Sequence, residues 1–279
     1  MTCPGSRLAH SVPVSEPQAT DRRAYWEERL RGEFSLDGVG YAGLGKAFNR
    51  QMYRVRRHGF LRLLRPLVGA GAEVLDVGSG TGFYIERWRE LGAGRITGSD
   101  MTEVAVGQLS QRYPDHRFLR MDIGANKLPL PDASFHFVSA IDVLFHIVDD
   151  DAHARAFRNL ARLVRPGGRV IVSENLYRVP PTPAAHQVGR SEAEITRRIE
   201  GAGLVLERRA PMFVLMNTPV RSGSARHLAA WRRLISMVKR WPALGGFLGA
   251  ALYPVEAALV ERVRDAPSTE FLVCRRPGE

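Results

Sequence analysis

The chain has 279 residues, of which 44% are apolar and 25% charged, and these ordinary globular values exclude collagen-like, low-complexity and wholly disordered chains. Its two cysteines, Cys3 and Cys274, form no ligand-like pair, so we expect neither a disulfide framework nor a metal site. The net charge is +11, but residues 73–175 are near neutral and the excess lies on either side of them. The preference for Arg over Lys is typical of GC-rich coding sequences, and an anionic substrate or nucleic acid is the alternative explanation.

The N-terminal part of the sequence predicts a tail followed by a helical cap. Residues 1–20 are rich in Pro and Ser and show no periodicity, which indicates a flexible tail. Residues 21–72 show helical patterns interrupted by glycines, so we expect a cap of helices rather than a separate domain. The first 25 residues contain no apolar run, so we expect no secretory signal and a cytoplasmic location.

From residue 73 the pattern changes to short apolar runs that alternate with helical segments. Strands separated by helices of this length form βαβ units, so we expect a parallel sheet covered on both faces. The expected strands are 74–77, 95–98, 116–121, 135–141 and 169–173, and the expected helices are 81–91, 102–113 and one that begins at 149–151.

The C-terminal part of the sequence completes this domain, which we place at residues 73–279. Ser191 to Glu194 has the pattern of a capping box and predicts a helix that ends near Gly201. Further strands are expected within 204–220 and at 269–275.

Residues 221–265 separate the last two predicted strands and are rich in Trp, Leu and Ala. We expect a helical insertion there, and insertions of this length usually have a function. Its segment 241–255 is uncharged, but at 15 residues it is shorter than a membrane span. We therefore expect a buried helix or a lid, and no membrane span.

The strongest signal is the run from Val74 to Gly82, a strand that enters a glycine turn and then a helix. Glycines permit positive φ angles and let a ligand touch the backbone, and the following helix presents free N–H groups to that ligand. This pattern predicts a nucleotide-like cofactor. The loop residues expected to contact it are Asp76, Gly78, Ser79, Gly80 and Gly82.

Charge decides which cofactor suits this loop. The spacing G-x-G-x-G differs from the G-x-G-x-x-G of dinucleotide sites, and Asp76 repels a pyrophosphate but attracts an ammonium or a sulfonium. S-adenosylmethionine carries both cations, so Asp76 favours it. Asp100 and Asp122 end the next two strands, where one suits the ribose hydroxyls and the other the adenine amine. For any one of these acids, a helix N-cap is the structural alternative.

An ordered set of motifs runs through residues 73–175. It resembles the class I S-adenosylmethionine-dependent methyltransferases, nearest the ubiquinone/menaquinone-biosynthesis type. The resemblance implies an α/β, Rossmann-like fold with a seven-stranded, mostly parallel sheet and an antiparallel last strand. It also implies that Met101 and Ile123 help to hold the cofactor. One departure is His136, where relatives usually have Asp at a position that is generally structural. The motifs are the Asp76–Gly82 loop, Asp100, Arg120–Asp122, Leu128–Phe135, Val143–Ile147 and Leu163–Gly168.

The methyl acceptor is expected at the end of the fourth strand. Methyl transfer is an in-line displacement that depends on positioning, and a hydroxyl acceptor must also lose a proton. Asp142 and His146 are the candidate catalytic residues, with Glu174 a weaker one. As alternatives to catalysis, His146 would fix the loop after the strand, and Asp142 would position the acceptor. A flat acceptor offers a stacking partner to aromatic residues of the cap and the insertion, and ordinary packing of amphipathic helices is the alternative role of each. These residues are Tyr41, Tyr53, Trp231 and Trp241.

We expect methylation of a small biosynthetic metabolite, most readily at oxygen. No Asn-Pro-Pro-Tyr or Asp-Pro-Pro-Tyr tetrapeptide, which would suggest amide or exocyclic-amine methylation, is present. Nucleic acid is therefore not the expected partner. An RNA methyltransferase that uses the basic flanks is the alternative, and a non-catalytic cofactor-binding partner or regulatory protein is the second. The sequence leaves the acceptor and the oligomeric state open.

Overall fold

The structure is a computed structural model that describes residues 22–40, 44–178, 180 and 187–278. The tail predicted at 1–20 lies outside these residues. The main sheet has seven strands: β1 (Glu73–Val77), β2 (Arg95–Asp100), β3 (Arg117–Arg120), β4 (Phe135–Ala140), β5 (Val164–Glu174), β8 (Val205–Pro211) and β9 (Glu270–Arg275).

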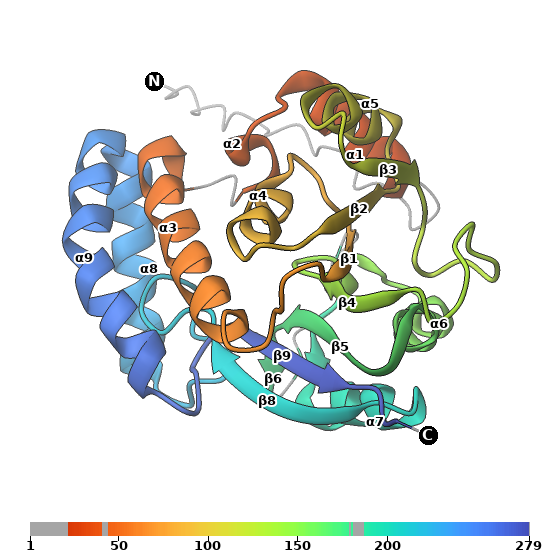
Figure 1. Cartoon of the computed structure of the whole chain (residues 1–279). Coiled ribbons are helices and arrows are strands. Elements are labelled where there is room, and N and C mark those ends of the chain that lie inside the picture. The colour runs from red at the N-terminus through yellow and green to blue at the C-terminus, as the bar shows by residue number, and fades with distance from the viewer. Residues whose placement is uncertain (1–21, 41–43, 179, 181–186, 279) are drawn as a thin grey trace, which may run out of the picture.

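The strands follow the order β3-β2-β1-β4-β5-β9-β8 (Figure 1). The first five are parallel, and β9 lies between β5 and β8 and is antiparallel to both. A small parallel pair, β6 (Leu176–Tyr177) and β7 (Arg190–Ser191), accompanies this sheet. The predicted seven-stranded sheet with one antiparallel strand is confirmed.

Helices lie in the regions where helical patterns were found. The predicted capping box is present, because Glu194 N donates to Ser191 Oγ and the Glu194 carboxylate accepts from Ser191 N. The helices are α1 (Arg22–Gly32), α2 (Leu36–Val39), α3 (Gly45–Leu64), α4 (Phe83–Glu90), α5 (Glu103–Arg112), the 3₁₀ turn η2 (Leu144–His146), α6 (Asp150–Leu163), α7 (Glu192–Gly201), α8 (Ala225–Arg240) and α9 (Pro242–Arg262).

Two hydrophobic clusters form the core, one on each face of the sheet. In β1, Val74 belongs to the cluster that includes α3 and α4, whereas Leu75 and Val77 belong to the cluster that includes α6 and α7. This alternation follows from the two-residue period of a strand. Because both of its faces are buried, the central strand β1 carries apolar residues on both sides, as in other parallel sheets.

The start of β5 differs from the prediction. β5 begins at Val164, five residues earlier than expected, because Val164 pairs with Phe135 before a register shift in β4. Gly167 lies in this earlier part of the strand, where its N–H donates to Arg276 O at 2.9 Å. His136, the departure from the family pattern, accepts a hydrogen bond from Glu73 N at 3.0 Å and so has a structural role.

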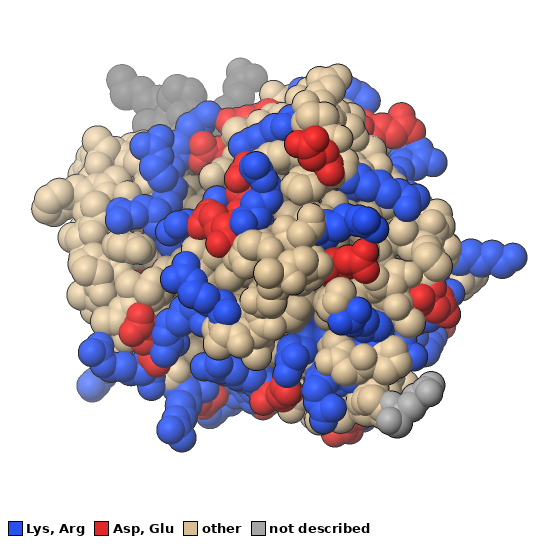
Figure 2. All heavy atoms as spheres, viewed as in Figure 1, with Lys and Arg blue, Asp and Glu red and all other residues tan. Residues whose placement is uncertain are grey.

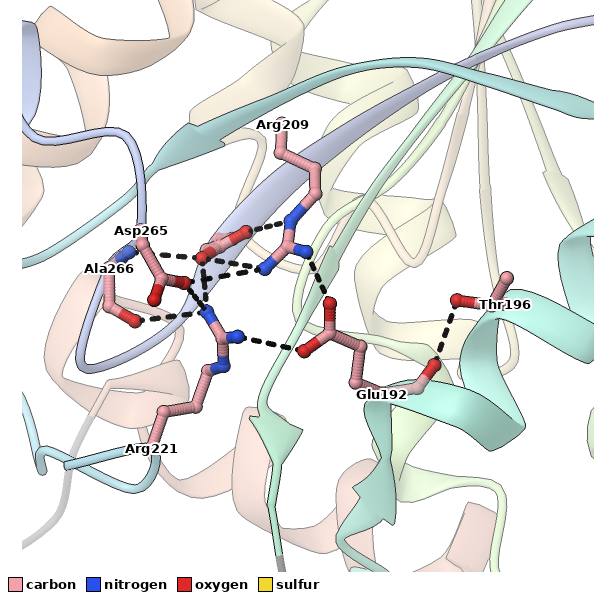
Figure 3. Close-up of polar contacts among 7 residues, drawn as sticks. Glu192, Thr196, Arg209, Arg221, Asp265 and Ala266 are labelled. Carbon is pink, nitrogen blue, oxygen red and sulfur yellow. Dashed lines mark hydrogen bonds and ion pairs between the residues drawn. The ribbon is translucent and has the colours of Figure 1, made fainter. Parts of the chain in front are cut away.

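The insertion is closed at its base by a cluster of charged residues (Figure 3). Arg221, which precedes α8, pairs with Asp265, which follows α9. Arg221 also pairs with Glu192 at the start of α7 at 2.7 Å, and with Glu270 of β9 at 3.0 Å. Arg209 of β8 binds the same Glu270 at 2.7 Å. The insertion is thus tied to the last two strands of the sheet.

The segment expected to be a buried helix or a lid is instead an outer helix. α9 packs along α3, and its outward side is solvent-exposed (Figure 1). It is 21 residues long and apolar enough to match a membrane span by length and composition. Only 22% of its most apolar window is buried inside the protein. The expected burial is therefore wrong, because the helix continues beyond the uncharged segment and presents its apolar side outward.

Candidate active site

A cavity of about 800 Å³ lies at the carboxyl ends of the parallel strands, the edge where open α/β sheets bind ligands. One wall is the loop after β1, and other walls come from α1, α3 and the turn after β4. Nine of the residues predicted to hold the cofactor or act on the acceptor line it: Gly78, Ser79, Gly80, Asp100, Met101, Asp122, Ile123, Asp142 and His146.

The glycine loop is held against β2 by backbone hydrogen bonds. Gly78 N and Ser79 N both donate to Ser99 O, at 2.7 and 2.9 Å. Gly78 has a φ of +70°, and a Cβ there would lie 2.4 Å from Val143 Cγ2. Glycine is therefore required at this position both for the backbone conformation and for space.

Asp100 fixes the same loop from the end of β2. Its Oδ2 accepts a hydrogen bond from Gly80 N at 2.9 Å, and its Oδ1 accepts from the backbone and the hydroxyl of Thr102 at 2.9 and 2.7 Å. Burial raises the pKa of this carboxyl. A carboxylate oxygen has two lone pairs, so Asp100 retains the capacity to accept a hydrogen bond from a ligand hydroxyl.

An unsatisfied hydroxyl in the cavity wall indicates a polar ligand. Thr81 Oγ1 is buried, and no described residue forms a hydrogen bond with it. Buried hydroxyls in native proteins are nearly always paired. The unpaired hydroxyl and the adjacent glycine backbone therefore fit the polar amino-acid end of S-adenosylmethionine.

Asp76 is buried beside the cavity and is hydrogen-bonded to the neighbouring strand β4. Its side chain is buried, is not part of the cavity wall, and accepts a hydrogen bond from Ser139 Oγ at 2.6 Å. Residues 74 and 76 of a strand face the same side, and Val74 packs in the cluster that contains Trp88. The Asp76 carboxyl is thus held within the fold, and its contact with the cofactor stays a prediction. Burial raises the pKa of this carboxyl to about 7.

Gly82 also lies outside the cavity wall. It precedes α4 with a φ of +84°, and a Cβ there would lie 2.7 Å from Leu109 Cδ2 and 3.2 Å from Tyr113 Cε2. Because no side chain intervenes, the turn before α4 packs closely on Leu109 and Tyr113 at the end of α5. The geometry gives Gly82 a packing role, and its contact with the cofactor stays a prediction.

Asp122 and Ile123 lie at the end of β3, under the N-terminal helix. Asp122 Oδ1 accepts a hydrogen bond from Gly124 N at 2.8 Å, and Arg22 of α1 lies 3.7 Å from its Oδ2. Asn159 Nδ2 donates to Ile123 O at 2.7 Å and so fixes the backbone of this loop. α1 thus covers the part of the cavity that the sequence predicts for adenine.

Asp142 has two partners at the end of β4. It pairs with Arg56 of α3, its Oδ1 accepts from Ser173 Oγ at 3.0 Å, and its N–H donates to the same hydroxyl at 2.7 Å. Its φ of +59° is rare outside glycine, and strained residues of this kind cluster at functional sites. Because both carboxylate oxygens have partners, the geometry favours positioning over proton transfer for Asp142.

Arg56 is a partly buried cation in the acceptor half of the cavity, beside Tyr53 and Tyr84. Burial opposes its charge and the neighbouring Asp142 carboxylate favours it, and the pKa of Arg56 is raised overall. Burial raises the pKa of Tyr53 to about 12 and also raises that of Tyr84, so both phenols are neutral at pH 7. A fixed cation in such surroundings stabilises negative charge on an acceptor oxygen.

His146 ends η2 and contacts the N-terminal cap. Its ring lies 5.1 Å from the indole of Trp26, at an interplanar angle of 78°. Arg22 Nη1 donates a hydrogen bond to His146 O at 3.3 Å. Both partners belong to α1, so the N-terminal cap holds His146 in the cavity wall.

A chain of neutral polar side chains ends in the same half of the cavity. Asn217 Nδ2 donates to Thr269 Oγ1 at 2.9 Å, and that hydroxyl donates to Asn175 Oδ1 at 2.6 Å. All three residues line the cavity. Asn175 is the last acceptor in this series of hydrogen bonds and uses its Oδ1 for it. Its amide N–H groups therefore remain as donors for the oxygen of a methyl acceptor.

The remaining candidates divide between the cavity and other parts of the fold. Tyr53 lines the cavity, whereas Trp231 and Glu174 are buried outside its wall. Trp241 is exposed at the start of α9. Tyr41 lies outside the described residues.

Sequence reasoning missed Trp26, Arg56 and Asn175 as cavity residues. Arg56 belongs to a basic helix in which its neighbours Arg54 and Arg57 look the same in sequence. Asn175 comes directly after β5, at the edge where ligands bind, and this position was the available signal. Among the described residues, no group of three or more His, Cys, Asp or Glu is arranged to hold a metal ion.

Several known proteins are similar to this chain. The methyltransferase-domain model matches residues 74–168. A probable S-adenosylmethionine-dependent methyltransferase of Mycolicibacterium smegmatis is 31% identical over 187 residues, which cover 64% of this chain and 66% of that one. 27-O-demethylrifamycin SV methyltransferase of Amycolatopsis mediterranei is 33% identical over 49% of this chain and 48% of its own. A ubiquinone biosynthesis O-methyltransferase of Pseudomonas aeruginosa is 36% identical over 37% of this chain and 44% of its own.

The chain thus spans less than two thirds of the length of these curated relatives. Among solved structures, the N-methyltransferase NodS from Bradyrhizobium japonicum WM9, in complex with S-adenosyl-L-homocysteine, superposes with a TM-score of 0.54. The alignment covers 92% of this chain and 99% of NodS, at 16% identity. At this identity the similarity concerns the fold alone.

Proposed function

The chain belongs to the class I S-adenosylmethionine-dependent methyltransferases, near the ubiquinone type, and we propose that it methylates a hydroxyl oxygen of a small organic acceptor. The observation that carries the choice of oxygen is the Arg56–Asp142 pair, which lies with His146 in one half of the cavity. The names of two curated relatives, 27-O-demethylrifamycin SV methyltransferase and ubiquinone biosynthesis O-methyltransferase, refer to methylation at oxygen. This supports the proposal of an oxygen acceptor.

Different residues of the cavity have different roles in the proposed reaction. S-adenosylmethionine supplies, when bound, an electrophilic methyl group on a sulfonium, and its amino-acid end fits the loop from Gly78 to Thr81. In the proposal, His146 accepts the proton that the acceptor hydroxyl loses. Arg56 stabilises the negative charge that develops on that oxygen, and Asp142 holds Arg56 in place. Asn175 donates a hydrogen bond that orients the acceptor.

A direct test uses the purified chain with methyl-labelled S-adenosylmethionine and a panel of phenols, polyols, amines and RNA transcripts. We expect label on a hydroxyl-bearing small molecule, located at oxygen by NMR of the product. Label on nitrogen, carbon or RNA would overturn the proposal. RNA binding would also weaken steeply with salt, because neutralised phosphates release counterions. Cofactor binding without transfer to any acceptor class would favour the non-catalytic alternative.

The location of the protein is also a proposal. We propose the cytoplasm, because the buried thiol of Cys274 in β9 suits a reducing compartment, where free cysteines behave as small apolar residues.

A further inference from the structure

The outer side of α9 is an apolar stripe. Every residue in it is exposed, and Phe247 has 71% of its surface exposed. The positions recur at helical spacing, so they form one continuous strip along the helix. Figure 2 shows this side of the molecule, at the left edge, as a largely uncharged surface with basic side chains near it. The stripe consists of Ala243, Phe247, Ala250, Ala251, Pro254 and Val255.

The inner side of α9 is built into the fold. A Cβ on Gly249 would lie 2.9 Å from Gln51 Cγ, so the glycine lets α9 approach α3 closely. Glu256 is buried and accepts hydrogen bonds from Val214 N, Leu215 N and Met216 N at 2.7, 2.8 and 3.2 Å. A helix fixed in this way to a loop of the catalytic domain cannot also cross a bilayer without losing these contacts.

The helices around the stripe are strongly basic. α3 carries six Lys or Arg residues, α8 five and α9 one, and the acidic residues of these three helices are Glu256 and Glu261. Glu256 is buried, and Glu261 pairs with His58 at 2.9 Å. The basic residues of α8 form no ion pair with any described residue; they are Arg226, Arg232, Arg233, Lys239 and Arg240.

We propose that this face, defined as the α9 stripe together with the basic residues of α8, docks on the surface of an anionic lipid bilayer. Apolar side chains of such helices enter the boundary between headgroups and acyl chains, and basic residues next to them bind anionic headgroups. Trp241, at the start of α9, is of the type enriched at that boundary. The apolar stripe and its basic surroundings therefore match the two components of the bilayer surface.

Charge also argues against two other occupants. A second copy of the chain would bring the same unpaired cations of α8 face to face, which opposes self-association. RNA would match the cations but leave Phe247 and the aliphatic stripe without a partner, since the stripe offers no side-chain hydrogen-bond donor. Lys239 lines the active-site cavity and lies in the last turn of α8, so the docking face is next to the cavity.

Vesicle flotation of the full chain tests the proposal. We expect binding to vesicles of phosphatidylcholine and phosphatidylglycerol, and much weaker binding to phosphatidylcholine alone. Phe247→Glu should lower the bound fraction on anionic vesicles at least tenfold. Val205→Glu, which changes another exposed apolar residue on β8, should leave it unchanged. The thermal shift with S-adenosylhomocysteine verifies that both variants fold, and neither residue lines the cavity.

A second pair of variants tests the charges. Arg232→Glu combined with Arg233→Glu should abolish binding to anionic vesicles, whereas Arg158→Glu combined with Arg165→Glu should not. Raising the salt concentration should weaken wild-type binding. The proposal is overturned if wild type ignores anionic vesicles, if Phe247→Glu binds like wild type, or if bound protein resists alkaline extraction. It is equally overturned if Phe247 instead mediates a dimer, seen by ultracentrifugation, or RNA binding.

Discussion

Arg221 and Asp265, the first and last residues of the helical insertion, form an ion pair that closes its base (Figure 3). The two partners differ in burial, because the Arg221 side chain is 8% exposed and the Asp265 side chain 68%. Arg221 also pairs with the fully buried Glu270. Removing Arg221 should therefore lower the free energy of unfolding more than removing Asp265.

We expect Arg221→Met to lower the free energy of unfolding by about 2 kcal/mol, because the buried Glu270 carboxylate loses one of its two cations and keeps Arg209. Asp265→Asn should lower it by less than about 1 kcal/mol, as for an exposed pair. Urea denaturation of wild type and both variants measures these losses. Equal losses would show that the exposed ion pair, and not the buried one, holds the insertion.

The position of Asp76 gives a test of how it influences cofactor binding. S-adenosylhomocysteine at about 100 times its Kd should stabilise the wild type by roughly 2.7 kcal/mol, which corresponds to about 5–10 °C in Tm. Asp76→Asn keeps an acceptor for Ser139 Oγ and should retain most of this shift. Asp76→Ala leaves Ser139 without that acceptor and should reduce it. Loss of the shift in Asp76→Asn would restore the electrostatic role that the sequence predicts.

The same carboxyl should make stability depend on pH. Burial raises its pKa in the folded protein from 3.8 to about 7, so the folded state binds more protons than the unfolded state between these values. Stability contributed by this group therefore falls as pH rises from about 4 to 7 and is constant above 7, a change on the order of 4 kcal/mol. The difference in unfolding free energy between wild type and Asp76→Asn isolates the effect. A difference that is independent of pH would contradict the assigned burial.

Much of the fold could be predicted because its signals are local. The glycines after β1 and the acidic residues at the start of α6 are local stop and start signals, which can be recognised from neighbouring residues alone. The start of β5 could not be placed in this way, because Val164 joins the sheet only through its pairing with Phe135. The solvent exposure of α9 could not be predicted from the sequence either, since an apolar run looks the same whether it faces a core or solvent.

The site follows the same division. Asp100 and Asp122 were found because strand ends in a parallel sheet converge at one edge. Asp76 faces the same side of β1 as Val74, and which residues its carboxyl contacts depends on Ser139 of the neighbouring strand, which the sequence alone does not place beside it. Arg56 was missed because its partner Asp142 lies 86 residues away, and a contact of that separation is created only by folding.

That contact supplies the last prediction. If Arg56 and Asp142 act as a unit on the acceptor, Arg56→Met and Asp142→Asn should each lower kcat/KM for the acceptor about 100-fold, equivalent to about 2.7 kcal/mol of transition-state stabilisation. The double variant should be no slower than the worse single variant, because the pair has already been broken. The KM for S-adenosylmethionine and the thermal shift with S-adenosylhomocysteine should not change. Additive losses in the double variant would mean that the two residues act independently, with Asp142 contributing through Ser173 rather than through Arg56.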